Sequence, residues 1–229
     1  MIIEDQMILD SLDDCIFEEL TTENFESLIF DYCNLDFFAN NFATGASKGV
    51  LFLKDDDSKV VKIPLSHYES EVWNDEGEGN WEYKVIPFHG ASCSNGNSWD
   101  YCRLECDIYE KAKEAGLEKY FLKTQCIGSV NSHPIYTQEK ADNTLFEVKN
   151  YAYDGDFGLP ELKKKHEGID IYMIDPQWVY DFISFYGIDE LVKLQDFLRE
   201  NKLDRDLHSE NIGYRDGKPI LIDYSDYHN

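Results

Sequence analysis

The chain has 229 residues and a mass of 26.7 kDa, and its 46 Asp and Glu outnumber its 21 Lys and Arg, which gives a formal net charge of −25 at pH 7. Nucleic acids and anionic membrane surfaces attract basic proteins, so this balance argues against partners of either kind. Hydrophobic residues make up 42% and aromatic residues 14% of the chain, which argues against disorder and predicts one large or two modest domains.

The N-terminus and the cysteines predict the compartment. Residues 1–5 lack the basic start of a signal peptide, and no apolar run approaches a membrane span, so we expect a soluble, cytoplasmic protein. The six cysteines include no C-x-x-C pair, and although Cys102 and Cys106 lie one helical turn apart, no second pair completes a zinc site. We therefore expect reduced thiols that pack as small apolar residues.

The N-terminal half predicts helices followed by strands. Residues 1–36 are expected to form an acidic, mostly helical extension, because Phe25, Leu28, Ile29 and Tyr32 recur at helical spacing. Strands are predicted from Phe37 onward, at 37–44, 50–53 and 60–63, with a turn at 55–58. Residues 66–97 contain two stretches rich in turn-forming residues and predict an inserted loop or small hairpin.

The C-terminal half predicts mainly helices. A helix is expected from Trp99 to Lys113, with Gly116 as its stop, then strands at 120–127 and 134–138 and helical stretches near 159–166 and 176–201. Asp216-Gly217 between two apolar runs predicts a hairpin near the end. This order of elements predicts an α+β fold with two lobes.

One segment near the C-terminus resembles the protein-kinase-like superfamily. The run Asp204-Arg205-Asp206-Leu207-His208-Ser209-Glu210-Asn211, with Asp223 twelve residues later, resembles the H-R-D-x-x-x-x-N catalytic loop and the metal-binding Asp that follows it. Asp204 replaces the first His of that motif, and Asp223-Tyr224-Ser225 replaces Asp-Phe-Gly. The same run also looks like the D-x-H-x-x-N loop of aminoglycoside- and choline-kinase-type enzymes.

This resemblance implies roles for three residues. Asp206 would accept a hydroxyl proton from the acceptor, and Asn211 and Asp223 would ligate Mg²⁺. The predicted hairpin supports the metal pair independently, since its two ends would bring both side chains to one hard cation. The alternative is a solvated acidic loop, because so many carboxylates supply accidental pairs.

Two further segments are similar to the family's nucleotide-binding parts. Residues 44–50 look like its Gly-rich loop, which implies that Gly45 and Val50 contact the nucleotide. Residues 60–63, Val-Val-Lys-Ile, resemble the V-A-I-K strand, which implies that Lys62 binds the α- and β-phosphates. The alternative for Lys62 is the exposed face of an edge strand.

The resemblance also implies a glutamate that pairs with Lys62 and a hinge that contacts adenine. Glu105 and Glu110 of the predicted helix are the candidates, and Glu105 is nearer the apolar stripe, so we choose it. Residues 135–141, which include Glu139, would be the strand and hinge that offer backbone groups to adenine.

The domain organisation and function follow from this resemblance as expectations. We expect an extension at 1–36 and one protein-kinase-like domain at 37–229, with an N-lobe at about 37–140 built on an antiparallel sheet, an insertion at 66–97 and a C-lobe at about 141–229. Six residues follow Asp223, so the helical C-lobe is expected to be much reduced. The resemblance implies an ATP- and Mg²⁺-dependent phosphotransferase, bacterial or phage in origin, that acts on a hydroxyl of a protein or small molecule. The alternatives are a pseudokinase that regulates a partner and an acidic decoy that blocks a nucleic-acid-binding protein.

Overall fold

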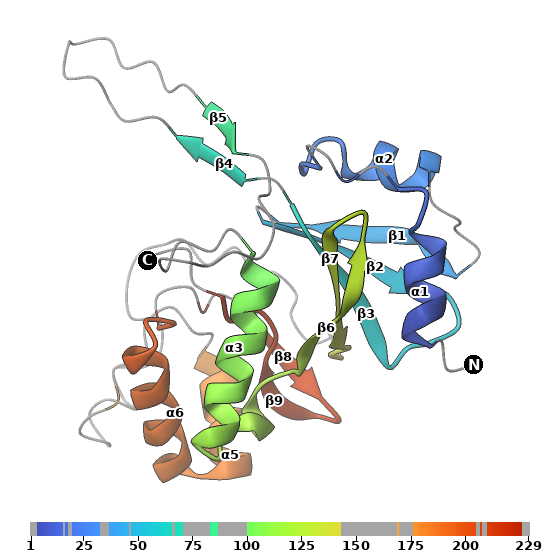
Figure 1. Ribbon diagram of the computed structural model, residues 1–229. Coiled ribbons are helices and arrows are strands. Elements are labelled where there is room, and N and C mark those ends of the chain that lie inside the picture. The colour runs from blue at the N-terminus through green and yellow to red at the C-terminus, as the bar shows by residue number, and fades with distance from the viewer. Residues whose placement is uncertain are drawn as a thin grey trace, which may run out of the picture. The chain divides into compact units, whose positions relative to one another are not determined.

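The computed structural model divides the chain into two compact units (Figure 1). It describes residues 4–15, 17, 20–32, 37–45, 47–65, 67–70, 83–86, 100–142, 169, 176–204, 207 and 210–225. The first unit comprises Met1–Leu104 and Thr124–Gln138, and the second comprises Glu105–Lys123 and Glu139–Asn229. The boundary after Gln138 lies close to the division predicted at about residue 140. The stretch Glu105–Lys123 belongs to the second unit, although it was expected in the N-lobe.

A five-stranded sheet forms the centre of the first unit. Its strands are β1 (Phe38–Thr44), β2 (Lys48–Leu53), β3 (Lys59–Pro64), β6 (Thr124–Val130) and β7 (His133–Glu139), in the order β1-β2-β3-β7-β6. The pairs β1/β2, β2/β3 and β6/β7 are antiparallel, so the expected α+β fold with an antiparallel sheet is confirmed. β3 is the middle strand, and the turn before it is an Asx turn in which Oδ1 of Asp56 accepts from the backbone N–H and the hydroxyl of Ser58.

The N-terminal segment packs against one face of this sheet. Helix α2 (Phe25–Tyr32) forms where helical spacing predicts one. Helix α1 (Asp5–Ser11) forms within the segment that was expected to be mostly helical, and it lies beside β6 (Figure 1). Their apolar side chains join one core with inward-facing strand residues, and this core contains Ile8, Leu12, Phe25, Ile29, Leu51, Leu53, Val61, Ile63 and Ile135. Because successive strand residues point to opposite faces, the residues between these positions face the other side of the sheet.

Part of the predicted insertion forms a small hairpin. Strands β4 (His67–Ser70) and β5 (Tyr83–Ile86) pair antiparallel as a separate two-stranded sheet (Figure 1). The other residues between 71 and 99 lie outside the described ones.

The second unit packs helices against a short hairpin. Helix α3 (Tyr101–Glu114) belongs to this unit from Glu105 onward. A 3₁₀ turn, η1 (Glu118–Tyr120), follows it. Helices α5 (Pro176–Tyr186) and α6 (Ile188–Glu200) contact each other, and α5 also contacts β9 (Lys218–Leu221), the partner of β8 (Ile212–Arg215). The fully buried Trp178 ties α5 to this hairpin, since its indole N–H donates to the carbonyl of Gly213 over 3.0 Å.

Two predicted elements differ in the structure. The helical stretch expected at 176–201 is two helices, because Gly187 between them has φ of 90°, which L-residues rarely adopt. The strand expected at 120–127 begins only at Thr124, because residues 118–120 form η1 instead. The helical stretch expected near 159–166 lies outside the described residues.

The expectation that all cysteines are reduced is wrong for Cys15, which is disulfide-bonded. Cys102, Cys106 and Cys126 are thiols. The sequence argument rested on the absence of an export signal, which bears on the compartment and not on which cysteines lie close together. None of the helices in the described part of the chain is both long enough and apolar enough to cross a membrane.

The buried His133 of β7 predicts a pH dependence of stability. Its ring stacks on Phe17 with 4.7 Å between ring centroids, Nε2 donates to the carbonyl of Pro64 over 2.9 Å, and burial lowers its pKa to about 4. As the pH falls, the unfolded chain therefore protonates this histidine at about pH 6.5, whereas the folded chain does so only at about pH 4. The contribution of neutral His133 to the free energy of unfolding, up to about 3 kcal/mol, is therefore complete above pH 6.5 and is lost as the pH falls from 6.5 to 4. Urea unfolding at pH 7.5 and pH 4.5 measures the free energy of unfolding of wild type and of His133→Gln, and the loss between these pH values should be smaller in the variant. A variant whose stability falls as steeply with acid as that of wild type would contradict it.

Candidate functional site

Lys62 is a buried cation on the middle strand of the sheet. It lies on β3, the third of five strands, and is 3% exposed. The alternative of an exposed lysine on an edge strand is therefore wrong. In the register of β2 and β3, Lys62 is directly opposite Val50, so two of the predicted nucleotide-binding residues are cross-strand neighbours.

Lys62 and Val50 lie on the sheet face opposite the N-terminal helices. Their strand neighbours Leu51, Val61 and Ile63 belong to the apolar core beneath those helices, so strand alternation places Val50 and Lys62 on the other face. Lys48, 4% exposed, belongs to the same face by the same alternation. One face of the sheet is thus an apolar core, and the other carries two buried lysines.

The loop between β1 and β2 contains Gly45, the residue predicted to approach phosphate. The backbone N–H of Gly45 donates to the carbonyl of Lys48 over 2.9 Å, and its carbonyl accepts from the hydroxyl of Thr22 over 2.9 Å. Among the described residues, a Cβ at position 45 would meet only the carbonyl oxygen of Lys48, at 3.9 Å, so the described part of the loop leaves space there. The N-terminal segment therefore holds this loop through its backbone and leaves space beside Gly45.

Gly49, the second glycine of the segment that resembles the Gly-rich loop, has a packing role. A Cβ at this position would lie 2.1 Å from the ring of Phe25, which is completely buried. Only glycine lets α2 approach β2 this closely. The sequence reasoning missed this role, since the sequence does not reveal that α2 crosses β2 here.

Of the two glutamates considered as the helix partner, Glu105 is buried and Glu110 is not. Glu105 is 0% exposed, whereas the side chain of Glu110 is 62% exposed and forms an ion pair with Lys113 at 3.3 Å. The choice of Glu105 as the more buried acid is confirmed. Lys62 belongs to the first unit and Glu105 to the second, so their pairing stays a prediction.

Asp100 is a buried acid that the sequence reasoning missed. One oxygen of its carboxylate accepts from the backbone N–H of Arg103 over 2.9 Å, which caps the N-terminus of α3, and the other accepts from the hydroxyl of Tyr136 on β7. Burial raises the pKa of Asp100, although these hydrogen bonds oppose the rise. Asp100 thereby fixes the start of α3 to the sheet face that carries Lys62, because Tyr136 follows Ile135 of the apolar core on β7. An Asp directly before a helical pattern was the available signal.

The predicted metal residues meet at the open end of the β8/β9 hairpin. Asp216 and Gly217 have φ of 51° and 70°, as a two-residue type I′ turn requires. At the other end the carbonyl of Asn211 accepts from the backbone N–H groups of Ile222 and Asp223, over 2.9 and 3.2 Å. The prediction that the hairpin brings Asn211 and Asp223 together is confirmed for their backbones.

The oxygens of Asn211 and Asp223 are of the type that Mg²⁺ prefers. Asn211 is 6% exposed, and the Asp223 carboxylate accepts a hydrogen bond from the hydroxyl of Ser225 over 3.2 Å. Over the described ranges, no group of three or more His, Cys, Asp or Glu could hold a metal ion. Two such oxygens from the described residues suit Mg²⁺ where water or other oxygen ligands complete its coordination.

The other two predicted site residues are Asp206, the expected base, and Glu139, expected in the hinge. Asp206 lies outside the described residues, but its neighbour Leu207 is 1% exposed in the core of the second unit. Glu139, expected in the hinge, forms an ion pair with Arg215, and its backbone N–H donates to the carbonyl of Lys123 over 3.2 Å. The side chain and N–H of Glu139 are thus already used within the protein.

No protein-family model matches this sequence, and the search of curated proteins finds no match.

The two glycines of the β1/β2 segment are expected to differ in how much the same substitution destabilises the protein. Gly49→Ala should reduce the free energy of unfolding by about 1–3 kcal/mol, because the new methyl group overlaps the Phe25 ring. Gly45→Ala should change it by less than about 0.5 kcal/mol, because it adds the same methyl group in open space. Urea unfolding of both variants tests the assignment. Equal losses would show that the two positions do not differ as described.

Proposed function

We propose that this chain binds ATP together with Mg²⁺ and transfers the γ-phosphoryl group to a hydroxyl acceptor, through a two-lobed arrangement that resembles the protein-kinase-like superfamily. The proposal assigns phosphate binding to Lys62, its orientation to Glu105, the acceptor-side base to Asp206 and the metal ligands to Asn211 and Asp223.

The burial of Lys62 on a middle strand carries this proposal. A buried ammonium group is costly unless an anion compensates it. The sequence around it resembles V-A-I-K, and the helix that follows the strand contains Glu105, an acid that is completely buried. A lysine on the third strand and a glutamate on the next helix are the pair that protein kinases use to hold the α- and β-phosphates.

The hairpin supports the proposal from the other unit. Asn211 and Asp223 are adjacent through the hydrogen bond between their backbones, and Asn211 is buried. The motif that contains Asp206 ends at Asn211, so the base and the metal ligands belong to one continuous loop and hairpin.

The chemistry of these residues is positioning and charge neutralisation. When bound, Mg²⁺ would neutralise the negative charge of the phosphate oxygens. Lys62 and the open backbone at Gly45 would bind the nucleotide. Asp206 would accept the acceptor's proton as the new oxygen–phosphorus bond forms and the bond to ADP breaks.

Lys62→Met is expected to weaken nucleotide binding without unfolding the protein, because methionine keeps the apolar stem and removes the charge. Lys59→Met is the control, since Lys59 lies on the same strand but forms an ion pair with Asp5 of α1, with 2.8 Å between Nζ and Oδ1. Calorimetry with ATP and Mg²⁺ should give a dissociation constant at least about tenfold higher for Lys62→Met, the loss expected for one charge-assisted contact. Equal affinity in Lys62→Met and wild type would contradict the role of Lys62.

Asp206→Asn is expected to separate turnover from binding. It should leave the affinity for ATP nearly unchanged and lower phosphoryl transfer by roughly 10²-fold or more, as removal of a positioned base does. Glu210→Gln in the same loop is the control. The assay follows autophosphorylation and ATP hydrolysis by purified protein, since no acceptor has been identified. A wild-type protein that binds ATP but transfers nothing to itself, to water or to extract would favour the pseudokinase alternative.

A further inference from the structure

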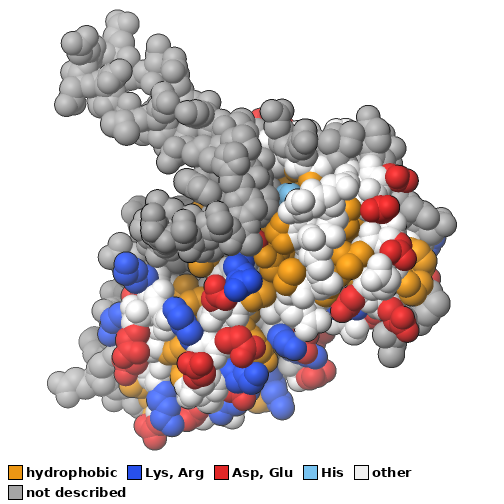
Figure 2. Space-filling view, in the orientation of Figure 1, with side chains coloured by type: hydrophobic (Ala, Val, Ile, Leu, Met, Phe, Trp, Pro, Cys, Tyr) orange, Lys and Arg blue, Asp and Glu red, His pale blue; other side chains and the backbone are white. Residues whose placement is uncertain are grey.

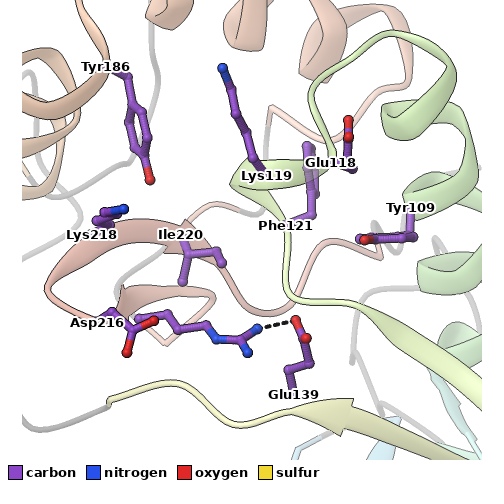
Figure 3. Close-up of a pocket in the computed structure, with 10 residues that line it drawn as sticks. Tyr109, Glu118, Lys119, Phe121, Glu139, Tyr186, Asp216, Lys218 and Ile220 are labelled. Carbon is purple, nitrogen blue, oxygen red and sulfur yellow. Dashed lines mark ion pairs between the residues drawn. The ribbon is translucent and has the colours of Figure 1, made fainter.

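Charges of both signs are mixed over the second unit, where Lys and Arg side chains are interspersed with Asp and Glu (Figure 2). Its pocket of about 260 Å³ shows the same balance, since three cations and three acids are among the described residues that line it (Figure 3). Arg215 and Glu139 of this lining form an ion pair, drawn as a dashed line in Figure 3. The pocket therefore selects a ligand of neither charge. By contrast, the loop between β1 and β2 in the first unit is held by specific contacts from the N-terminal segment.

A hydrogen bond joins the N-terminal segment to the β1/β2 loop. The hydroxyl of Thr22 donates to the carbonyl of Gly45 over 2.9 Å, across 23 residues of the chain. The backbone N–H of Gly45 donates to the carbonyl of Lys48, also over 2.9 Å, and this bond closes the loop. The N–H of Gly45 is thus held by the hairpin itself, and its carbonyl is held by Thr22.

The capped start of α2 fixes the position of Thr22. The backbone N–H of Thr21 donates to Oδ1 of Asn24 over 2.6 Å, and the backbone N–H of Asn24 donates to the hydroxyl oxygen of Thr21 over 3.4 Å. This reciprocal arrangement resembles a capping box, and it leaves the hydroxyl of Thr22 outside the cap. The completely buried ring of Phe25 then packs where a Cβ of Gly49 would lie. One polar and one apolar contact therefore dock the start of α2 on the β1/β2 hairpin.

The hydrogen bond from Thr22 fixes the direction of the Gly45 carbonyl. Loops that bind phosphate do so with backbone N–H groups that point at the anion. A carbonyl oxygen only accepts hydrogen bonds, so it repels phosphate when it turns toward one. Because glycine has more backbone freedom than any other residue, a donor from outside the loop is needed to hold this carbonyl on the side of α2.

The acids around Thr22 cannot take over this role. Residues 1–36 contain neither Lys nor Arg, and the exposed Glu23 and Glu26 lie close to Thr22 in the sequence. Their carboxylates accept hydrogen bonds but do not donate them, and they repel phosphate. The neutral hydroxyl of Thr22 holds the carbonyl without adding negative charge to the loop.

From this hydrogen bond and the docked start of α2, we propose that Thr22 is a positioning residue for nucleotide binding, which holds the Gly45 carbonyl toward the N-terminal segment and away from the phosphates. The inference rests on the proposed function, because it places Gly45 beside the phosphates of ATP. Thr22 acts through the loop and does not itself contact the nucleotide. The N-terminal segment thereby becomes a determinant of nucleotide affinity.

Thr22→Val removes the hydroxyl and keeps the branched shape of the side chain, whereas Thr22→Ser keeps the donor. Ser27→Ala on α2 is the matched control, because the hydroxyl of Ser27 donates to the carbonyl of Asn24 over 3.1 Å, within the N-terminal segment itself. Amide hydrogen exchange, measured by NMR on the protein without ATP, follows the N–H of Gly45. Its exchange should be about fivefold faster in Thr22→Val, the equilibrium factor of one typical net hydrogen bond, and within about twofold of wild type in the other two variants.

Calorimetry with ATP and Mg²⁺ then measures the effect on nucleotide binding. The dissociation constant should rise about fivefold in Thr22→Val and stay within about twofold of wild type in Thr22→Ser and Ser27→Ala. Unchanged exchange at Gly45 in Thr22→Val, or an equal loss of affinity in Ser27→Ala, would overturn the inference. Faster exchange with unchanged affinity would also overturn it, and would leave the proposed function standing where Lys62→Met still weakens binding. A wild-type protein that does not bind ATP would overturn the proposed function, and the role of Thr22 with it.

Discussion

The buried charge on the middle strand constrains much of the first unit. An ammonium group cannot be buried against an apolar core without compensation, so a sheet that places Lys62 on β3 must keep its two faces chemically distinct. The N-terminal helices cover one face with Ile8, Leu12, Phe25 and Ile29. The other face receives Lys48 and Lys62. Asp100 and Tyr136 then attach the start of α3 on that side by one hydrogen bond.

The N-terminal segment has two roles in this arrangement. Residues 1–36 contain eleven Asp and Glu and neither Lys nor Arg, so they contribute much of the negative charge. Their apolar side chains nevertheless belong to the core of the first unit, and Thr22 and Phe25 contact the loop and strand that contain Gly45 and Gly49. A segment that seemed from its charge to be an extension is thus part of the support for the candidate nucleotide loop.

In the second unit, η1 and the hairpin are held by a few strong polar contacts. The hydroxyl of Tyr120 donates to Glu190 over 2.5 Å, and Lys193 and Lys119 pair with the same carboxylate, contacts that lower the pKa of Glu190 to about 2. The hydroxyl of Tyr224 donates to the carbonyl of Leu122 over 2.6 Å beside the pairing of Phe121 with Leu221. The contacts of Tyr224 and Leu221 hold the end of the hairpin where Asn211 and Asp223 lie beside residues 121–122.

The sequence alone determined the features that depend on local patterns. Helical spacing placed α2, alternation and turn residues placed the strands, and Asp216-Gly217 placed the hairpin, because such signals act over a few residues. The position of Lys62 within an apolar strand was also visible. Tertiary structure decided which residues became buried and what they met: that β3 is central, that Gly49 accommodates Phe25, and that Asp100 meets Tyr136. These facts join residues distant in the chain, and a single sequence carries no local signal for such contacts.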